Sequence, residues 1–530
     1  MKVTQIPFQE TGFFSKTMVD YLEQKEAIRP FYNNYPDNNG FKNQLEEKGQ
    51  SFSKAHRKVL VAALKNQYTT IEVSEETQGN IDSLIHSNTF TVTTGHQLNL
   101  FTGPLYFLYK IISAINLAEE LSLQFPASNF VPVYWMATED HDFDEINYFN
   151  FRNNKVQWNR PDGGAVGHFS TEGLQEVFEQ FSKQLGDTKN AEFLKSLFEE
   201  GYLKNETLAG ATRYISNQLF SKFGLVIIDG DAKDLKQLYT PIVAKEFTEQ
   251  VSYNAVSKTI TALEKEYKIQ VNPREINQFY LSDNSRERII KEGDRYVVNN
   301  TDISFSEEEL LKHLDEAPQN FSPNVIMRPL YQEVILPNLA YIGGGGELAY
   351  WLELKDYFKE VNIPFPILLL RNSVQVVSAK QQKKLDRLDI STAEMFLSTN
   401  DLLKKKINEN SDIEFNFLDA KTLLEQQFLA LRRVANETDT SFIGAVSAQE
   451  KKQLNGLGNL EKRLLRAEKR KQQDLVVRIS DLKSQLFPNQ SLEERHRNFS
   501  EYYLEYGDRF IESLKNTLKP LELEFTILEL

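Results

Sequence analysis

Four short, continuously apolar segments constrain the fold of this chain more than any other feature. Each is β-rich, leads into a polar or glycine-containing turn, and belongs to a pattern in which strands alternate with helices. The segments are NTFTVTTGHQ (88–97), NFVPVYWMATEDHD (129–142), FGLVIIDGDAKDLKQLY (223–239) and VNIPFPILLLRNS (361–373). Continuous rather than alternating hydrophobicity is typical of strands buried on both faces, as in a parallel sheet covered by helices. The sequence therefore predicts an α/β fold with a Rossmann-like core.

The segments between these strands are more polar and resemble insertions into the core. From about residue 379 the pattern becomes long and amphipathic, and leucines recur at steps of three and four between Leu454 and Leu486. Lys471 interrupts that series, which favours a helical hairpin or short antiparallel coiled coil over a long zipper. The predicted organisation is a core in three parts (1–150, 222–250, 321–378), two insertions (151–221, 251–320), a helical coiled-coil domain (379–505) and a C-terminal segment returning to the core (506–530).

The composition of the chain excludes several classes of function and location. The formal net charge of the 530-residue chain is -14, which argues against nucleic acid as a partner. The chain has no cysteine, so disulfides, thiolate metal sites and a cysteine nucleophile are excluded. The N-terminus lacks the apolar region of a signal peptide, and no run of eighteen apolar residues predicts a membrane span. We therefore expect a cytoplasmic protein with no membrane partner.

The stretch WMATEDHDFDE (135–145) places a cluster of acids and a histidine directly after a predicted buried strand. Ligands of open α/β sheets bind beyond the carboxyl ends of the strands. Asp140, His141 and Asp142 are therefore candidate catalytic residues, either as a base with an orienting carboxylate or as ligands of a divalent metal. Adjacent residues of an extended chain point to opposite sides, so all three cannot face one ion. Asp144 and Glu145 are better explained as acids at the start of a helix.

The stretch TTGHQLNLFTGPLY (93–106) is a second candidate, between a predicted strand and a helix. Backbone amides at a helix N-terminus can bind an anion. The candidate anion-binding residues are Gly95, His96, Gln97, Thr102 and Gly103. The alternative is a turn in which His96 is satisfied locally.

Two further stretches complete the candidate site. AYIGGGGELAYW (340–351) contains Gly343, Gly344, Gly345, Gly346 and Glu347, and consecutive glycines suit close approach of the backbone to a ligand. The stretch lacks the lysine and hydroxyl of a Walker loop, and the alternative explanation for its glycines is a tight bend. In SPNVIMRPLYQEVILP (322–337), Arg328 with Asn324 could clamp a carboxylate or phosphate, and Arg371 after the last strand is similar. A structural role for these arginines is the alternative.

In combination these stretches resemble the bacillithiol biosynthesis cysteine-adding enzyme family, BshC. The resemblance rests on TTGHQLNLFTGPLYFLYKIISAINLA, VPVYWMATEDHDFDEIN, SPNVIMRPLYQEVILPNLAYIGGGGELAYW and the C-terminal helical stretch, and it covers essentially the whole chain. It implies a Rossmann-like core with two connecting-peptide insertions and a coiled-coil domain that pairs two subunits into a homodimer. It also implies a reaction that joins the carboxyl of cysteine to the amine of glucosaminyl-malate.

Amide formation from a carboxylate needs activation, commonly by ATP, and a base that deprotonates the amine. ATP and a divalent metal are the candidate cofactors, although the sequence holds no standard nucleotide motif. The sequence is also compatible with two other functions. A metal-dependent hydrolase or transferase would use Asp140, His141 and Asp142 as its ion site, and a coiled-coil scaffold would use the 379–500 helices to bind partners.

Overall fold

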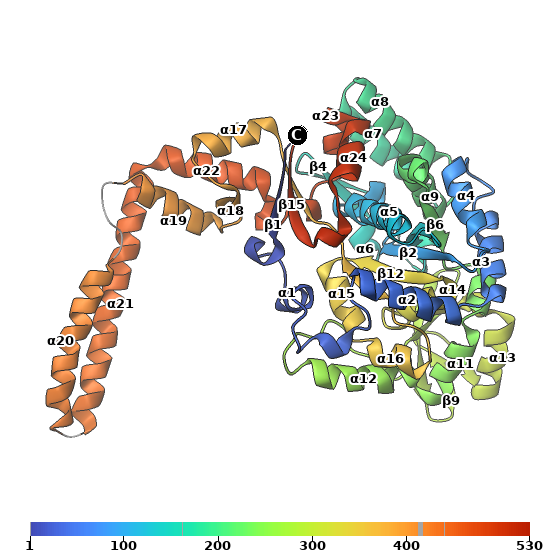
Figure 1. The fold of residues 1–530 in the computed structure, drawn as a ribbon, viewed down its shortest axis with the longest axis horizontal. Helices are drawn as coiled ribbons and strands as arrows, with labels where there is room; N and C mark the ends of the chain where they lie inside the picture. Colours follow the sequence, from blue (N-terminus) through green and yellow to red (C-terminus); the bar gives the residue numbers. More distant parts are fainter. Residues whose placement is uncertain (1, 162, 412–416, 439) are drawn as a thin grey trace.

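The computed structural model describes residues 2–161, 163–411, 417–438 and 440–530. It consists of a large body from which a helical arm projects to one side (Figure 1). None of the helices in these ranges is long and apolar enough to cross a membrane.

The centre of the body is a five-stranded sheet with the order β13-β12-β2-β3-β6. Every neighbouring pair is parallel, which confirms the α/β prediction. Its strands are β2 (Thr89–His96), β3 (Asn129–Met136), β6 (Val226–Asp229), β12 (Asn338–Gly343) and β13 (Ile367–Leu370). The sequence prediction missed β12 as a strand. Its apolar run LAYI is short, and the four glycines that follow it are interpreted as a ligand-binding loop. All eight residues of β2 are buried, as expected for a central parallel strand.

Helices cover both sides of this sheet. In Figure 1, α5 (Tyr106–Gln124) lies on one side and α2 (Asn38–Ser51) on the other. The helix α5 is apolar over most of its circumference and is buried from Phe107 to Ala118. Such an all-round apolar helix belongs in the interior of a large protein. It connects β2 to β3 and so forms the first crossover of the sheet.

Two long segments interrupt the order of the core strands. Between β3 and β6 lie a short helix, α6 (Phe143–Ile146), a hairpin of β4 (Tyr148–Phe151) and β5 (Asn154–Gln157), and the longer helices α7 (Leu174–Leu185), α8 (Lys189–Phe198) and α9 (Leu208–Phe220). Between β6 and β12 lie α11 (Thr240–Glu249), α12 (Val251–Leu263), α13 (Glu307–Glu316), α14 (Met327–Ile335) and a second sheet.

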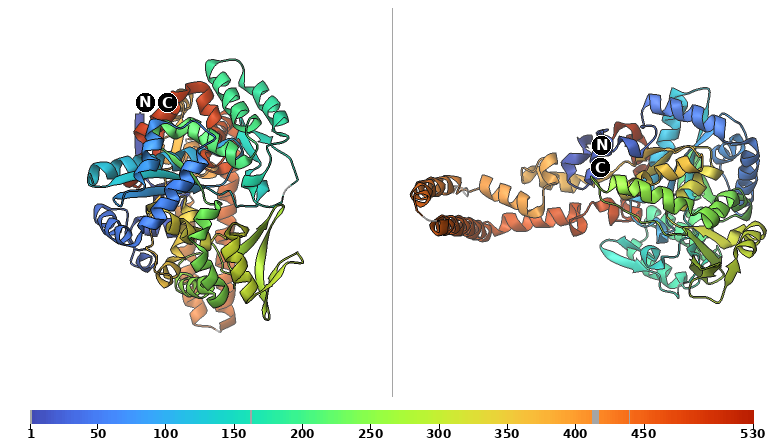
Figure 2. Two further views of the ribbon diagram at one scale, coloured as in Figure 1. Left: turned by 90° about the vertical axis from the view of Figure 1, so that its right-hand side faces the viewer. Right: turned by 90° about the horizontal axis from the view of Figure 1, so that it is seen from below.

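The second sheet, here called the inserted sheet, is antiparallel with the order β10-β9-β8-β7-β11. Its strands are β7 (Gln278–Ser282), β8 (Ser285–Glu292), β9 (Arg295–Val298), β10 (Ser304–Ser306) and β11 (Phe321–Pro323). It forms a separate layer at one side of the body (Figure 2, left).

The arm contains α19 (Thr399–Glu409), α20 (Leu418–Asn436), α21 (Thr440–Lys471) and α22 (Gln473–Leu486). At its far end α20 and α21 form an antiparallel hairpin (Figure 1). A helical hairpin is therefore confirmed, but it pairs α20 with α21 rather than lying wholly after residue 450. Lys471 is the last residue of α21, so the interruption that it makes in the leucine series coincides with the end of that helix.

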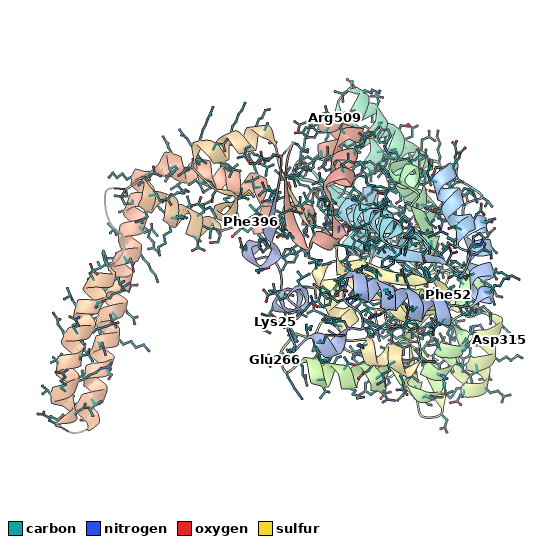
Figure 3. The ribbon with its side chains drawn as sticks, viewed as in Figure 1. Lys25, Phe52, Glu266, Asp315, Phe396 and Arg509 are labelled. Carbon is teal, nitrogen blue, oxygen red and sulfur yellow. The ribbon has the colours of Figure 1, made fainter. Side chains whose placement is uncertain are left out.

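A three-stranded sheet joins the arm to the body. Its order is β1 (Lys2–Pro7), β15 (Glu524–Glu529) and β14 (Val374–Val377). Phe396, labelled in Figure 3, lies at this junction, with its ring 5.5 Å from that of Phe487 and 5.2 Å from that of Phe525. The C-terminal tail thus forms the predicted strand, although its partners are β1 and β14 and not strands of the central sheet.

Candidate functional site

A cavity of about 780 Å³ opens at the carboxyl ends of β2, β3 and β12, where ligands of parallel α/β sheets bind. One side of it, here called the core wall, comes from the central sheet and its connections. The other side, here called the insertion wall, comes from the inserted sheet and the chain that leads into it. The core wall comprises His96, Tyr106, Lys110, Arg328, Tyr341, Glu347, Arg371 and Arg495, and the insertion wall Arg274, Asn277, Phe279, Arg286 and Arg288.

An ion pair between Lys110 and Glu347 organises the core wall. The Lys110 ammonium lies 2.6 Å from Glu347 Oε2 and donates to the Gly95 carbonyl at 2.6 Å. Burial lowers the pKa of Lys110. Burial would raise the pKa of Glu347, but Lys110, the Gly344 N–H and Arg328 together hold that pKa below its usual range. The Glu347 side chain is 29% exposed, so a charged carboxylate faces the cavity.

The glycine tract at 343–346 allows close packing around this carboxylate. Gly344 donates its backbone N–H to Glu347 Oε2 at 2.7 Å and caps α15 (Gly345–Leu352). A Cβ on Gly345 would lie 3.0 Å from the Met18 side chain. Gly344, Gly345 and Gly346 line the cavity as predicted, whereas Gly343 lies behind it, with its carbonyl accepting a hydrogen bond from the Arg371 backbone.

The two arginines predicted from the sequence both line the cavity, but they differ in whether a carboxylate pairs with their charge. Arg371 makes two hydrogen bonds to the buried Glu494 carboxylate, at 2.7 and 3.1 Å, so much of its charge is already neutralised. Arg328 donates to Gln332 at 3.1 Å and has no carboxylate within ion-pair distance in the described chain. Its guanidinium lies 5.6 Å from the Tyr341 ring and is therefore held by aromatic faces.

Behind the loop after β3, a buried lysine joins two carboxylates. The Lys236 ammonium lies 2.7 Å from Glu139 and 2.6 Å from Asp231, and it is 3% exposed. His168 of the first insertion lies 2.6 Å from the other oxygen of Asp231. Burial raises the pKa of Glu139, whereas for Asp231 the charges of Lys236 and His168 outweigh burial and lower the pKa. This network fixes the start of the segment Glu139–His141, which lines the cavity.

Asp140 and His141 lie where the loop meets the insertion wall. Asp140 accepts from Gln97 Nε2 at 2.9 Å and from the His141 backbone N–H at 2.8 Å. Arg286 Nη1 lies 2.8 Å from His141 Nδ1. Burial and the Arg286 charge lower the pKa of His141. A neutral ring that accepts from Arg286 at Nδ1 carries its proton on Nε2, so His141 can donate a hydrogen bond while Asp140 can accept a proton.

Other residues of the two N-terminal motifs lie elsewhere. Asp142 is exposed and is not among the cavity-lining residues. Thr102 and Gly103 form the turn between β2 and α5, where Thr102 has φ 69° and Gly103 has φ 65°. Asn498 donates to the Gly103 carbonyl at 2.6 Å, so this turn serves to attach the C-terminal part of the chain. The sequence motif does not reveal this, because its glycine and threonine suit a ligand loop and a strained turn equally well.

Three more candidates do reach the cavity. Gly95 approaches Tyr341 so closely that a Cβ would lie 3.0 Å from its hydroxyl. His96 is buried, and burial keeps its pKa well below the usual range; its Nε2 has no hydrogen-bond partner within the described ranges. Asn324 also lines the cavity, but its Oδ1 accepts the backbone N–H of Ile326 at 2.9 Å and its amide donates to Asn277, so it shapes the wall.

The donor set does not fit a metal ion. In the part of the chain that the structure describes, no three His, Asp or Glu side chains gather as they would around one ion. Asp140 lines the cavity, whereas Asp142, the residue before the short helix Phe143–Ile146, is exposed outside it.

Sequence reasoning missed several lining residues. Lys110 could have been noticed as a lone cation in an otherwise apolar helix. Arg286 and Arg288 stand two apart in SRERII, a spacing that puts them on one face of a strand. Arg274 and Arg495 carry no local signal, because only the fold brings the segments before β7 and after the arm to the cavity.

Comparisons with known proteins agree along the whole chain. The family described as "Bacillithiol biosynthesis BshC, N-terminal Rossmann-like domain" matches residues 1–372, and "Bacillithiol biosynthesis BshC, C-terminal coiled-coil domain" matches residues 374–530. Proteins named "Putative cysteine ligase BshC" are similar over nearly their full length. Those of Flavobacterium johnsoniae, Cytophaga hutchinsonii and Bacillus thuringiensis are 54%, 39% and 27% identical, covering 99%, 98% and 97% of this chain and 99%, 97% and 97% of their own. With both halves matched in order, the chain belongs to the BshC family of bacillithiol biosynthesis proteins.

Proposed function

We propose that this protein is a cysteine ligase that forms an amide between the carboxyl of cysteine and the amine of glucosaminyl-malate. Family membership supports the reaction class, and one observation of the site carries it. The cavity of an acidic chain is lined by arginines, of which only Arg371 is paired with a carboxylate in the described structure. Both proposed substrates carry carboxylates, so this surplus of positive charge suits them.

The chemistry requires a base, a hydrogen-bond donor and an activated carboxyl group. The amine nitrogen attacks the activated cysteine carbonyl carbon, a C–N bond forms, and the activated oxygen departs with its activating group. We assign Asp140 as acceptor of the amine proton and His141 Nε2–H as donor to the oxyanion. ATP is the proposed source of activation.

The decisive measurement is mass spectrometry of a reaction that contains glucosaminyl-malate, cysteine and ATP, with each component omitted in turn. Product that appears only in the complete mixture supports the ligase. Product without ATP would contradict the proposed activation, and no product under any condition would contradict the reaction itself.

Asp140→Asn is expected to lower kcat about a hundred-fold, because the group that accepts the amine proton is removed. Asp142→Asn is the matched control, since its exposed carboxylate lies outside the cavity and its activity should equal that of the parent. Steady-state rates and thermal unfolding of both variants test this. Equal losses in both would restore the sequence-based assignment of Asp142 to the catalytic group.

We also propose that the protein forms a homodimer through its arm. Phe428 and Ala435 of α20 are buried, whereas Leu423 and Val434 of the same helix are 60% and 55% exposed. An exposed apolar stripe on a hairpin of the coiled-coil domain suits a second copy of the same helix.

Leu423→Glu with Val434→Glu should therefore convert a dimer to the 61.3 kDa monomer in sedimentation equilibrium. Glu425→Lys, a charge change at another exposed position of α20, should leave the mass unchanged. A parent protein that is already monomeric would refute the dimer.

A further inference from the structure

The insertion wall concentrates positive charges that form no ion pair within the described part of the chain. Within residues 2–161, 163–411, 417–438 and 440–530, no carboxylate lies within ion-pair distance of Arg274, Arg286 or Arg288. The guanidinium groups of Arg274 and Arg288 also have no side-chain hydrogen bond in these ranges. Unpaired charges that face a cavity are a feature of sites that bind a ligand of opposite charge.

The geometry of β8 directs two of these arginines to the cavity. Arg286 and Arg288 are two residues apart, and side chains at this spacing lie on the same face of a strand. Ile289, which follows, is buried on the other face. Arg288 is opposite Phe279 of β7 in the sheet register, and the Arg286 guanidinium stacks on the Phe279 ring at 4.1 Å.

Arg286 is rigidly held, which prepares the wall for a planar anion. It donates to Ser322 Oγ at 3.1 Å and to the Pro323 carbonyl at 3.0 Å, besides its contact with His141. A fixed guanidinium with flanking cations recognises carboxylates through paired hydrogen bonds. Glu139 and Asp140, whose charges act on Arg286, are already bound to Lys236 and to Gln97.

The opposite wall differs in chemistry. Glu347 places a carboxylate there beside Lys110, a combination suited to the ammonium and carboxylate of an amino acid. The charged side chains of the insertion wall, as defined above, are all arginines, which suits a group with several negative charges. Asp140, the proposed acceptor of the amine proton, lies next to this cationic wall through His141 and Arg286.

We propose that Arg274, Arg286 and Arg288 bind the dicarboxylate end of the acceptor substrate, so that its amine lies near Asp140. The inference rests on the proposed function for the identity of the acceptor. It assigns recognition of the malate group to the inserted sheet and leaves the amino acid to the core wall.

Calorimetric titration of the full chain with glucosaminyl-malate, without cysteine or ATP, tests the assignment. Arg288→Ala and Arg274→Ala are each expected to weaken binding at least about ten-fold, because each removes charge-assisted hydrogen bonds. Methyl glucosaminide, which lacks both carboxylates, should bind the parent and the variants with the same weak affinity. Arg286 is not substituted in this test, because its removal would also break its hydrogen bonds to Ser322 and His141.

Two comparison variants separate the subsite from general effects. Arg295→Ala removes an arginine of the same inserted sheet that bonds Ser304 outside the cavity, and glucosaminyl-malate affinity should not change. Arg495→Ala removes an arginine of the core wall that forms no ion pair with any described residue, and it should leave acceptor affinity unchanged while raising the KM for cysteine.

Each outcome discriminates between the two proposals. Parent-like affinity in Arg288→Ala and Arg274→Ala, or an equal loss in Arg495→Ala, overturns the dicarboxylate subsite even if the parent makes product. Tight binding that depends on Arg288 and Arg274, together with no product from the complete reaction, supports the subsite and refutes the ligase.

Discussion

Replacing Lys236 with methionine is expected to destabilise the protein by about 3–5 kcal/mol at pH 8, because it leaves Glu139 as a buried, uncompensated carboxylate and leaves Asp231 with His168 alone as its ion-pair partner in the described structure. The loss should shrink as the pH falls. Burial already raises the pKa of Glu139, and without the ammonium that pKa rises further. An acid whose folded-state pKa is raised contributes its stability at low pH and loses it as the pH increases.

Thermal unfolding of Lys236→Met between pH 5 and pH 8 measures this dependence. Lys233→Met is the matched control, since Lys233 lies on the same helix (Lys233–Gln237) with an exposed side chain. Adding Glu139→Gln to Lys236→Met should recover part of the stability at pH 8, because it removes a buried carboxylate that has lost its ion-pair partner. A deficit that is constant with pH, or a double variant that is less stable still, would contradict the electrostatic account.

Glu494→Ala is expected to have a comparable effect at the junction between core and C-terminal segment. Glu494 is 1% exposed on its side chain, and it accepts two hydrogen bonds from Arg371 and one from the Val374 backbone at 3.2 Å. Its removal leaves a buried, permanently charged guanidinium, at a cost of about 3–5 kcal/mol. Because Arg371 also lies 5.2 Å from the Tyr106 ring in the core wall, ligase activity should fall as well.

Glu494→Gln should lose less than Glu494→Ala, since the amide oxygen can still accept from Arg371. Glu360→Ala serves as control, because Glu360 is exposed and makes no ion pair within the described ranges. Chemical unfolding and the ligase assay report stability and activity separately. Stability of Glu494→Ala equal to that of the control would show that the pair contributes nothing to the fold.

The apolar segments were sufficient to predict four of the five strands of the central sheet, all but β12, since continuous hydrophobicity has few explanations other than a strand buried on both faces. The same segments placed His96 and Asp140 correctly at the cavity, because the carboxyl ends of parallel strands share one edge. Prediction worked less well for Asp142 and Thr102. For Asp142, the side chains of neighbouring residues point in different directions once the chain bends. For Thr102, the sequence around a turn does not show whether the threonine faces a ligand or other parts of the protein.

The insertion wall shows why the rest of the site could not be predicted. Arg286 and Arg288 belong to an antiparallel sheet that is inserted between β6 and β12, far in sequence from Asp140. Their spacing indicates that both side chains lie on one face of a strand, but the neighbouring sequence does not show which part of the protein that face packs against. Arg495 is farther still, because the chain passes through the whole arm before it returns to the cavity.

The sequence by itself determined the α/β core, the presence of a helical hairpin in the arm, the edge of the sheet at which the cavity opens, and the family to which the chain belongs. These depend on short-range periodicity and on motifs that are read along the chain. Only the tertiary structure decided which charges the cavity presents. That depends on pairs such as Lys236 with Glu139 and Arg371 with Glu494, which neutralise some groups and leave the arginines of the insertion wall unpaired. Charge pairing acts through space across low-dielectric protein, so it follows the packing of distant segments and not their order in the sequence.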